Sequence, residues 1–531
     1  MRLTYKNHRG GNIMNTYLGL EFGSTRIKAV IIDDNAKVLA KGAYDWENTL
    51  SNGLFTYPEE QITDGLRTCY EDLAADYEKN QGEPLTKVNA LGFSGMMHGY
   101  IALDKDGEML VPFRTWRNTN AAEAADVLTN TLAFNIPMRW SISHLYQCIL
   151  DGEEHLAKLD YLTTLSGYIH YRLTGERVIG IGEASGMFPI DSAKLDYNEE
   201  MLGRFDALIA DKGYPWKLRD ILPKVLPAGA DAGRLTENGI KLLGDACKLT
   251  AGLPVCPPEG DAGTGMVATN SVKVKTGNVS AGTSSFAMVV LEKMTSSVHT
   301  EIDMVTTPDG SPVAMVHANT CTSDINAWAG LFADFAKAIG VDMSTGKLYD
   351  LLFAKSLEGD PDCGGLMNYN FFAGEPVVGL NSGKPLFVRR PDAKMTLANF
   401  WKTQIYSSLA TLAVGMEILR GENVEICEMC GHGGFFKAPD VGQRAMSAAM
   451  GCPVTVMENA GEGGAWGMAL LAAYRDEEFR GERTLGEFLD SAFSNEKKLT
   501  LSATDADKRD FAAFVEAFKA ALPVQKTAAE L

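Results

Sequence analysis

Short apolar runs near the N-terminus predict an antiparallel meander. Tyr17–Phe22 and Ile27–Asp33 flank a turn with glycine, and Lys37–Lys41 follows after a polar turn. Apolar runs bounded by Gly, Asn and Asp are typical of strands joined by tight turns. In Pro58–Tyr77 apolar side chains recur at helical spacing, which predicts an amphipathic helix. They are Ile62, Leu66, Cys69, Leu73 and Tyr77.

The same strand–turn–strand pattern returns in the middle of the chain. Leu20–Ile31 aligns without gaps on Val279–Val290, and Gly23 falls on Gly282. In both copies an apolar strand leads into glycine and two hydroxyl-bearing residues. This match favours a duplicated fold whose two turns face each other, although two unrelated hairpins with glycine turns would give the same pattern.

The second half of the sequence combines long helical patterns with short apolar strands. A strand is expected at Val424–Met429, followed by the loop Gly431-His432-Gly433-Gly434 and the helix Ala438–Met450. A loop between a strand and a helix can hold a nucleoside against its backbone. Other expected elements are the helices Thr320–Phe335, Met343–Lys355, Asn399–Arg420 and Glu458–Tyr474, and the strand Pro453–Met457.

Length and composition indicate a globular chain with two large domains. The 531 residues exceed a single core, and 45% are hydrophobic against 22% charged. The expected division is a polar lead-in at 1–15, an N-terminal domain at 16–268, a C-terminal domain at 269–505 and a helical tail at 506–531. Met14 is an alternative start.

The net charge of −19 argues against nucleic acid or an anionic membrane as partner. An anionic nucleotide would have to bind through local N–H groups and a cation. The sequence has no apolar run of about 18 residues and no signal-peptide pattern. Nine scattered cysteines fit reduced thiols, so we expect a cytoplasmic location.

Asp261 is the main candidate for chemistry, because it is an acid set among glycines in the stretch Glu259–Gly265, just before the second hairpin. A carboxylate beside a turn rich in N–H donors suits phosphate chemistry, since it can take a proton from an attacking hydroxyl. An N-cap for the following helix is the alternative role. Neither a P-loop nor a Rossmann glycine motif occurs in the sequence.

Two further stretches carry polar groups suited to a small polyol. Met97 and His98 lie in a glycine-flanked loop at the end of the strand Val88–Ser94, where α/β sheets place ligands. Trp116 and Asn118 precede a predicted helix. Either group could instead be structural, and His98 alone does not separate a cleft position from the edge of a core.

In motif order, the chain resembles the FGGY family of carbohydrate kinases, nearest to the pentulose kinases (xylulokinase and L-ribulokinase). Gly19–Thr25 resembles the family's first phosphate hairpin, Ser94–Gly99 its sugar-contacting loop and Gly260–Gly263 the motif of its catalytic Asp. Ala281–Ser284 resembles the second phosphate turn. Gly431–Gly434 and Ala465–Ala469 resemble the adenosine-binding region.

Three positions depart from the family pattern. Glu21 stands where the family usually has Asp, and His432 stands where it commonly has Gly. The stretch Trp116–Asn120 lacks the acid and the arginine of the usual W-x-D-x-R. The last difference leaves the identity of the sugar open.

The resemblance implies an α/β protein with two actin-like, ribonuclease H-type domains around a cleft that binds a sugar and ATP with Mg²⁺. Asp261 would accept the proton of a ketopentose terminal hydroxyl, and Glu21 would lie near the metal. Met97, His98, Trp116 and Asn118 would shape the sugar pocket. The expected ATP-binding residues are Gly23, Ser24, Thr25, Gly282, Thr283, Ser284, Gly433 and Gly434.

An ATP-driven conformational switch of the same superfamily is the alternative function. Such a protein would hydrolyse ATP slowly and bind a protein partner without a sugar. The Met97-His98 loop argues against this alternative, because a switch has no use for it. The sequence does not decide whether the chain forms a homodimer.

Overall fold

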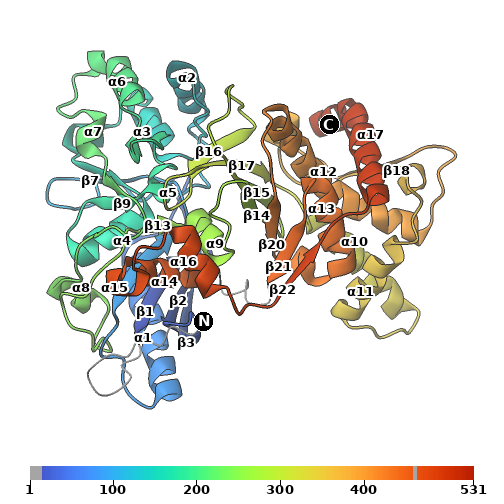
Figure 1. Cartoon of the computed structure of the whole chain (residues 1–531). Helices are drawn as coiled ribbons and strands as arrows, with labels where there is room; N and C mark the ends of the chain where they lie inside the picture. The colour runs from blue at the N-terminus through green and yellow to red at the C-terminus, as the bar shows by residue number, and fades with distance from the viewer. Residues whose placement is uncertain (1–14, 458–462) are drawn as a thin grey trace.

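The computed structural model describes residues 15–457 and 463–531, so the predicted lead-in lies almost wholly outside the described residues. Figure 1 shows two helix-flanked halves, each with a mixed β-sheet. The first sheet has five strands in the order β13-β6-β1-β2-β3. These are β1 (Thr16–Phe22), β2 (Arg26–Asp33), β3 (Val38–Asp45), β6 (Ala90–Gly95) and β13 (Glu259–Gly260).

The second sheet has seven strands in the order β16-β17-β15-β14-β20-β21-β22. They are β14 (Thr276–Ala281), β15 (Ser285–Val290), β16 (Ile302–Thr306), β17 (Pro312–Ala318), β20 (Glu428–His432), β21 (Val454–Met457) and β22 (Lys498–Leu501). In both sheets the first hairpin strand pairs antiparallel with the second and parallel with a later strand. This shared pairing confirms the predicted duplication.

The two hairpins differ in register by one residue, which the gapless alignment did not predict. Phe22 pairs with Ile27 in the first hairpin, whereas Ala281 pairs with Ser285 in the second. The second turn is therefore one residue tighter. Because side chains alternate between the faces of a sheet, the aligned residues of β2 and β15 do not occupy equivalent places.

The first sheet is covered on one face by α1 (Glu59–Gln81) and on the other by α14 (Gly463–Arg475). Gly19 of β1 lets α14 lie close to the strands, since a Cβ at Gly19 would overlap the α14 backbone at Ala465. Figure 1 shows α14, α15 (Glu477–Arg480) and α16 (Leu485–Ala492) among the elements of the N-terminal half. The chain thus returns to the first sheet after completing most of the second.

The N-terminal half also contains the segments between β3 and β13. Its helices are α2 (Ala122–Leu132), α3 (Ser141–Leu150), α4 (Leu165–Thr174), α5 (Ile181–Ala184), α6 (Glu199–Leu208), α7 (Leu218–Ile221) and α8 (Glu237–Leu242). Its short strands are β4 (Thr49–Ser51), β5 (Leu54–Thr56), β7 (Ile101–Leu103), β8 (Tyr161–Thr163), β9 (Val178–Gly180), β10 (Ile190–Asp191), β11 (Asp196–Tyr197) and β12 (Lys224–Leu226).

Helices flank the second sheet as well, and the long α12 packs into its core. The helices are α10 (Ser323–Ala338), α11 (Thr345–Ser356), α12 (Leu397–Gly421), α13 (Arg444–Met450) and α17 (Asp505–Glu530), with the small hairpin β18 (Leu366–Tyr369) and β19 (Leu386–Arg389). Among the described residues, none of the helices is both long and apolar enough to cross a bilayer.

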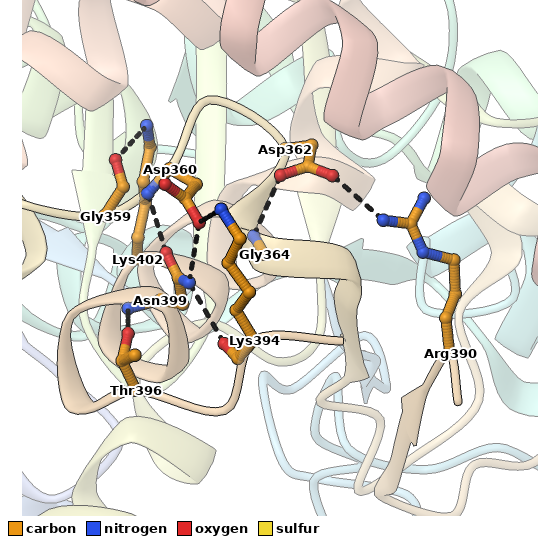
Figure 2. Close-up of polar contacts among 9 residues, drawn as sticks. All are labelled: Gly359, Asp360, Asp362, Gly364, Arg390, Lys394, Thr396, Asn399 and Lys402. Atoms are coloured by element: carbon orange, nitrogen blue, oxygen red, sulfur yellow. Dashed lines mark hydrogen bonds and ion pairs between the residues drawn. The ribbon is translucent and has the colours of Figure 1, made fainter. Parts of the chain in front are cut away.

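A polar network fastens the loop after α11 to the start of α12 (Figure 2). The Asn399 amide accepts from the backbone N–H of Asp360 at 2.6 Å and donates to the Asp360 carboxylate at 3.2 Å. Lys394 also pairs with Asp360, and Arg390 with Asp362. Because Asn399 follows the N-cap Thr396 of α12, the loop and the helix start hold each other in place.

Most predicted elements lie within a few residues of the observed ones, and β20 is the main exception. It begins at Glu428, although the apolar run predicted a strand from Val424. Asn423 has a φ of 58°, and the Val424 N–H donates to the Leu419 carbonyl. The first residues of the apolar run therefore form the C-terminal end of α12 and do not belong to β20. The predicted helix 458–474 is described only from Gly463, and the boundary at 268/269 stays a prediction.

Candidate active site

Three parallel strands of the first sheet end at the same level and bring the predicted site segments together. Phe22 of β1 and Gly260 of β13 both pair with Gly95 of β6. Beyond these ends lie the Gly23 turn, the Met97 loop and Asp261. The carboxyl ends of parallel strands are where α/β sheets bind ligands.

Asp261 is the first residue of α9 (Asp261–Ala268), and the N-cap position belongs to Gly260. Its Oδ1 accepts from the backbone N–H of Met97 at 3.2 Å and of Ala262 at 2.9 Å. Burial raises the pKa of Asp261, while these two N–H groups lower it. The carboxylate is thus held in one orientation beside the Met97 loop, and the N-cap alternative does not describe it.

Glu21 lies on β1, between Lys28 of β2 and Ser94 of β6. Burial raises the pKa of Glu21, Lys28 lowers it, and the charge of Asp261 raises it. The two acids are therefore close enough to interact. A Cβ on Gly464 of α14 would overlap Glu21 Oε1, so a larger residue there would displace the carboxylate.

In the first turn, nearby side chains hydrogen-bond the backbone carbonyl groups. Trp46 Nε1–H donates to the Gly23 carbonyl at 2.7 Å, and the Tyr57 hydroxyl donates to the Ser24 carbonyl at 2.6 Å. The backbone N–H groups of Ser24 and Thr25 find no acceptor among the residues that the structure describes. They are available to an anionic oxygen.

The second turn is built in the same way from different residues. Thr322 donates to the Gly282 carbonyl through both its N–H and its hydroxyl, and the Cys321 N–H donates to the Thr283 carbonyl. Within 15–457 and 463–531, nothing accepts from the N–H groups of Thr283 and Ser284. Each turn therefore offers two free N–H donors.

The predicted adenosine loop lies against this second turn. Gly433 has a φ of 108°, a conformation that favours glycine. A Cβ on Gly433 would overlap the carbonyl of Ala281, which directly precedes the turn. Gly434, in contrast, faces open space. The loop and the second turn thus form one continuous backbone surface.

Helix α9 lies between the two sheets and joins the two parts of the site (Figure 1). Near its start, Thr264 Oγ1 lies 3.1 Å from the Ser94 hydroxyl on β6. Just after its end, Thr269 Oγ1 accepts from Asn278 of β14 at 3.3 Å. Asp261 is therefore carried by an element that contacts both sheets.

The Met97 and His98 side chains are buried at the end of β6. His98 Nδ1 lies 3.1 Å from the Gly186 carbonyl, and its ring stacks on Trp140 with centroids 6.2 Å apart. Burial lowers the pKa of His98 to about 3, so the ring is neutral. A neutral ring that donates from Nδ1 has Nε2 free as an acceptor.

Trp116 and Asn118 are placed differently from this loop. Trp116 is 40% exposed, and its Nε1–H donates to the Ser24 hydroxyl at 3.3 Å. Asn118 is buried, and its amide bonds the backbone of Phe55 and Thr115. Trp116 thus supports the first turn, Asn118 supports β5, and their predicted sugar contacts stay predictions.

Two buried acids beside Asp261 were not predicted from the sequence. Glu259 accepts from the N–H groups of Gly182 and Glu183 at the start of α5, and burial raises its pKa to about 8. Glu183 is fully buried. The only sequence signal was the glycine-rich stretch 180–186, whose glycines leave room for the Glu259 carboxylate.

The oxygen-rich surroundings of Glu21 fit a hard cation such as Mg²⁺. Glu21 and Asp261 supply the carboxylate oxygens that this ion prefers. A separate group of Cys148, Glu153 and His155 has metal-ligand spacing. Arg114 donates to both Cys148 and Glu153, so a fixed positive charge already occupies that group.

Comparison with known proteins gives matches along most of the chain. Residues 16–267 match the N-terminal domain, and residues 277–475 the C-terminal domain, of the FGGY family of carbohydrate kinases. A xylulose kinase from Haemophilus influenzae is 22% identical over 423 residues, which cover 76% of this chain and 80% of that protein.

A glycerol kinase from Thermococcus gammatolerans is 26% identical over 237 residues, covering 41% of this chain and 47% of its own. The crystal structure of a gluconate kinase from Lactobacillus acidophilus superposes with a TM-score of 0.77 at 16% identity, over 97% of this chain and 99% of that one. These similar proteins differ in the substrate that their names give.

Proposed function

The chain belongs to the FGGY family of carbohydrate kinases, and from this premise we propose that it phosphorylates the terminal hydroxyl of a ketopentose, xylulose or L-ribulose, to the 5-phosphate. That it is an ATP-dependent sugar kinase follows from the family. The observation that supports the proposed chemistry best is the pair of equivalent turns with free N–H donors and one oriented carboxylate, Asp261, near the first.

Asp261 is the proposed general base. Its Oδ1 is held by two N–H groups, which leaves Oδ2 to accept the proton of the sugar hydroxyl as that oxygen attacks the γ-phosphorus. Burial raises the Asp261 pKa and so makes the carboxylate a stronger base than an exposed aspartate. In phosphoryl transfer, positioning and charge stabilisation supply most of the rate.

The two turns are the proposed phosphate donors. The N–H groups of Ser24, Thr25, Thr283 and Ser284 would hydrogen-bond the transferring and leaving oxygens. Glu21 and Asp261 would hold Mg²⁺, which when bound offsets the negative charge of the phosphates. Gly433 and Gly434 would place the adenosine beside the second turn.

The sugar is proposed to bind against the Met97-His98 loop. With Nδ1 tied to Gly186, His98 offers Nε2 as an acceptor for a sugar hydroxyl. Trp116 would close the pocket from the side of the first turn. The ketopentose is proposed from the resemblance to pentulose kinases and from the long match to the Haemophilus xylulose kinase.

A coupled assay of ADP release with separate sugars tests this function. D-xylulose, L-ribulose, D-ribulose, glycerol and gluconate would each be offered with ATP and Mg²⁺. We expect kcat/KM for one ketopentose to exceed that for glycerol and gluconate. If the rate of ATP turnover is the same with each sugar as without sugar, the proposal is contradicted. That result would favour the alternative, an ATP-driven conformational switch, which membership of the family does not favour.

The expected cytoplasmic location is also proposed here. It rests on the nine cysteines of the sequence, which are all free thiols in the structure. A homodimer stays a prediction. Fractionation of cells that express the tagged chain would test the location, and sedimentation would test the dimer.

A further inference from the structure

Glu375 is a buried acid of the C-terminal half that has no part in the steps above. It lies in the segment between β18 and β19, and its side chain is 0% exposed. Its backbone N–H donates to the Leu380 carbonyl at 2.8 Å, and its carbonyl accepts from the Leu380 N–H at 3.0 Å. These two bonds close a short loop that holds the side chain in place. A buried carboxyl group is expected to have a specific partner.

The partner of the Glu375 carboxyl group is a backbone N–H group. Its Oε1 accepts from the Thr320 N–H at 2.9 Å, and its Oε2 has no hydrogen-bond partner among the described residues. Burial raises the pKa of Glu375 to about 7, while the backbone N–H groups of Asn319 and Thr320 lower it. A carboxyl group accepts a hydrogen bond in its charged and in its neutral form. Glu375 therefore serves as an acceptor for Thr320 in either state.

Other groups of the same segment bind the chain around Thr320. The Asn370 amide donates to the carbonyls of Thr320 and Cys321, at 3.4 and 3.3 Å. The Asn319 amide donates to the Gly374 carbonyl at 2.6 Å. The residues around Thr320 are thus held from the segment that follows β18, and they are themselves buried or bonded to it.

The residues that follow Thr320 bind the carbonyl groups of the second turn. The Cys321 N–H donates to the Thr283 carbonyl at 2.8 Å, and the Thr322 hydroxyl donates to the Gly282 carbonyl at 2.7 Å. A peptide unit is planar and trans, so the direction of each carbonyl also fixes the direction of the next N–H group. Holding these two carbonyls therefore aims the free N–H groups of Thr283 and Ser284.

We propose that Glu375 is a positioning residue for ATP, which holds Thr320 and through it the two residues that aim the N–H groups of the second turn at the phosphates. This inference rests on the proposed role of that turn. Without Oε1, the buried Thr320 N–H would lack an acceptor, and the chain around it would shift to regain one. ATP affinity should then fall, whereas the sugar site in the other half should change little.

Calorimetric titration of the whole chain with ATP and Mg²⁺, without sugar, tests this role. Glu375→Ala should weaken ATP binding at least about fivefold. Glu375→Gln keeps an oxygen for Thr320 and should bind ATP within about threefold of wild type. Equal losses in the two variants would overturn the proposal. If Glu375→Ala does not fold, Glu375→Leu replaces it, because leucine fills the space without offering an acceptor.

Gln525→Ala is the control for a purely structural effect. Gln525 of α17 is also 0% exposed, and it donates to the Lys384 carbonyl at 2.8 Å, in the same segment between β18 and β19. Its loss should lower the unfolding midpoint in denaturant and leave ATP affinity within about threefold. An ATP affinity that falls as far in Gln525→Ala as in Glu375→Ala would contradict a specific role for Glu375.

A double-mutant cycle with Thr322→Val tests the route of the effect. Valine removes the hydroxyl that binds the Gly282 carbonyl and keeps the shape of the side chain. If Glu375 acts through these residues, the double variant should bind ATP no more than about threefold more weakly than the weaker single variant. Losses that multiply would mean that Glu375 acts by another route, against the proposal.

Kinetics separate this inference from the proposed function. With D-xylulose, Glu375→Ala should raise KM for ATP at least about fivefold and leave KM for the sugar within about threefold. An equal rise in both constants would count against the positioning role. A wild-type chain that binds ATP but phosphorylates no ketopentose would refute the proposed substrate, and the ATP affinities of the variants would still decide the role of Glu375.

Discussion

The two hairpins occupy equivalent places in their sheets, yet only the first carries charge. Glu21 pairs with Lys28 across the first hairpin, whereas Ser280 pairs with Phe286 across the second. The first lies beside Asp261 and two further buried acids. The second lies beside the glycine loop at Gly433, where backbone groups are the available donors.

The shared feature of the two hairpins is the treatment of the turn itself. In both, side chains or neighbouring N–H groups bind the turn carbonyls, and two N–H groups remain free. The two turns thus share the arrangement of free N–H donors, and charged side chains occur in the first copy alone. Four substitutions test this division.

The largest effect is expected for Asp261→Asn, which removes the proposed base from the charged half. The general-base contribution predicts a fall in kcat of about 10²–10⁴. ATP affinity should change little, because the second half is intact. Coupled assays and calorimetry measure the two quantities, with the exposed Asp342→Asn as control. Near-normal turnover would remove Asp261 from this role.

Gly433→Ala should damage the other half. The positive φ and the overlap with Ala281 would strain the loop by about 1–3 kcal/mol, roughly 5- to 150-fold in ATP affinity. Gly330→Ala, on α10 of the same half, is the matched control, since a Cβ there meets open space. Equal effects of the two substitutions on ATP binding would argue against the proposed adenosine position.

Gly464→Ala should act on the charged half through Glu21. The added Cβ would push the carboxylate from its rotamer, at about 0.5–1.5 kcal/mol, or roughly 2- to 12-fold in kcat. KM for ATP should change less than it does in Gly433→Ala. Steady-state kinetics, with Gly203→Ala as control, measure both. If Gly464→Ala changed only KM for ATP, the result would contradict the proposal that the first half supplies the charged residues and the second half binds ATP.

The smallest effect is expected for Trp116→Phe, which removes one exposed hydrogen bond to Ser24. Because such a bond contributes about 1 kcal/mol or less, KM for ATP should rise by no more than about fivefold. A larger rise in KM for the sugar would support the predicted sugar contact of Trp116. Both constants come from the same assay.

Local patterns predicted most of this fold, because they record local physics. The hairpins, α1 and the strand ends beside Met97 follow from apolar periodicity and turn residues. The duplication also came from the sequence, although the one-residue difference in register did not. Register depends on how tightly each turn closes, and both turn sequences permit either length.

The long-range contacts of the site could not be predicted in this way. Glu183 has ordinary neighbours in sequence, and only the folded chain brings it against Gly260. From the sequence, the Asn118 amide is available for a ligand. In the structure, it is hydrogen-bonded to the backbone of Phe55. Such roles depend on which groups the fold places beside a side chain, and a single sequence does not give these contacts.

The return of α14 to the first sheet has a consequence for synthesis on the ribosome. The strands β1 and β6 leave the exit tunnel early, but the helix that covers one of their faces emerges hundreds of residues later. Until α14 has been synthesised, that apolar face of the sheet stays exposed and can bind chaperones. A product terminated just before Gly463 would expose it permanently, so premature stops should yield aggregates and not a working N-terminal fragment.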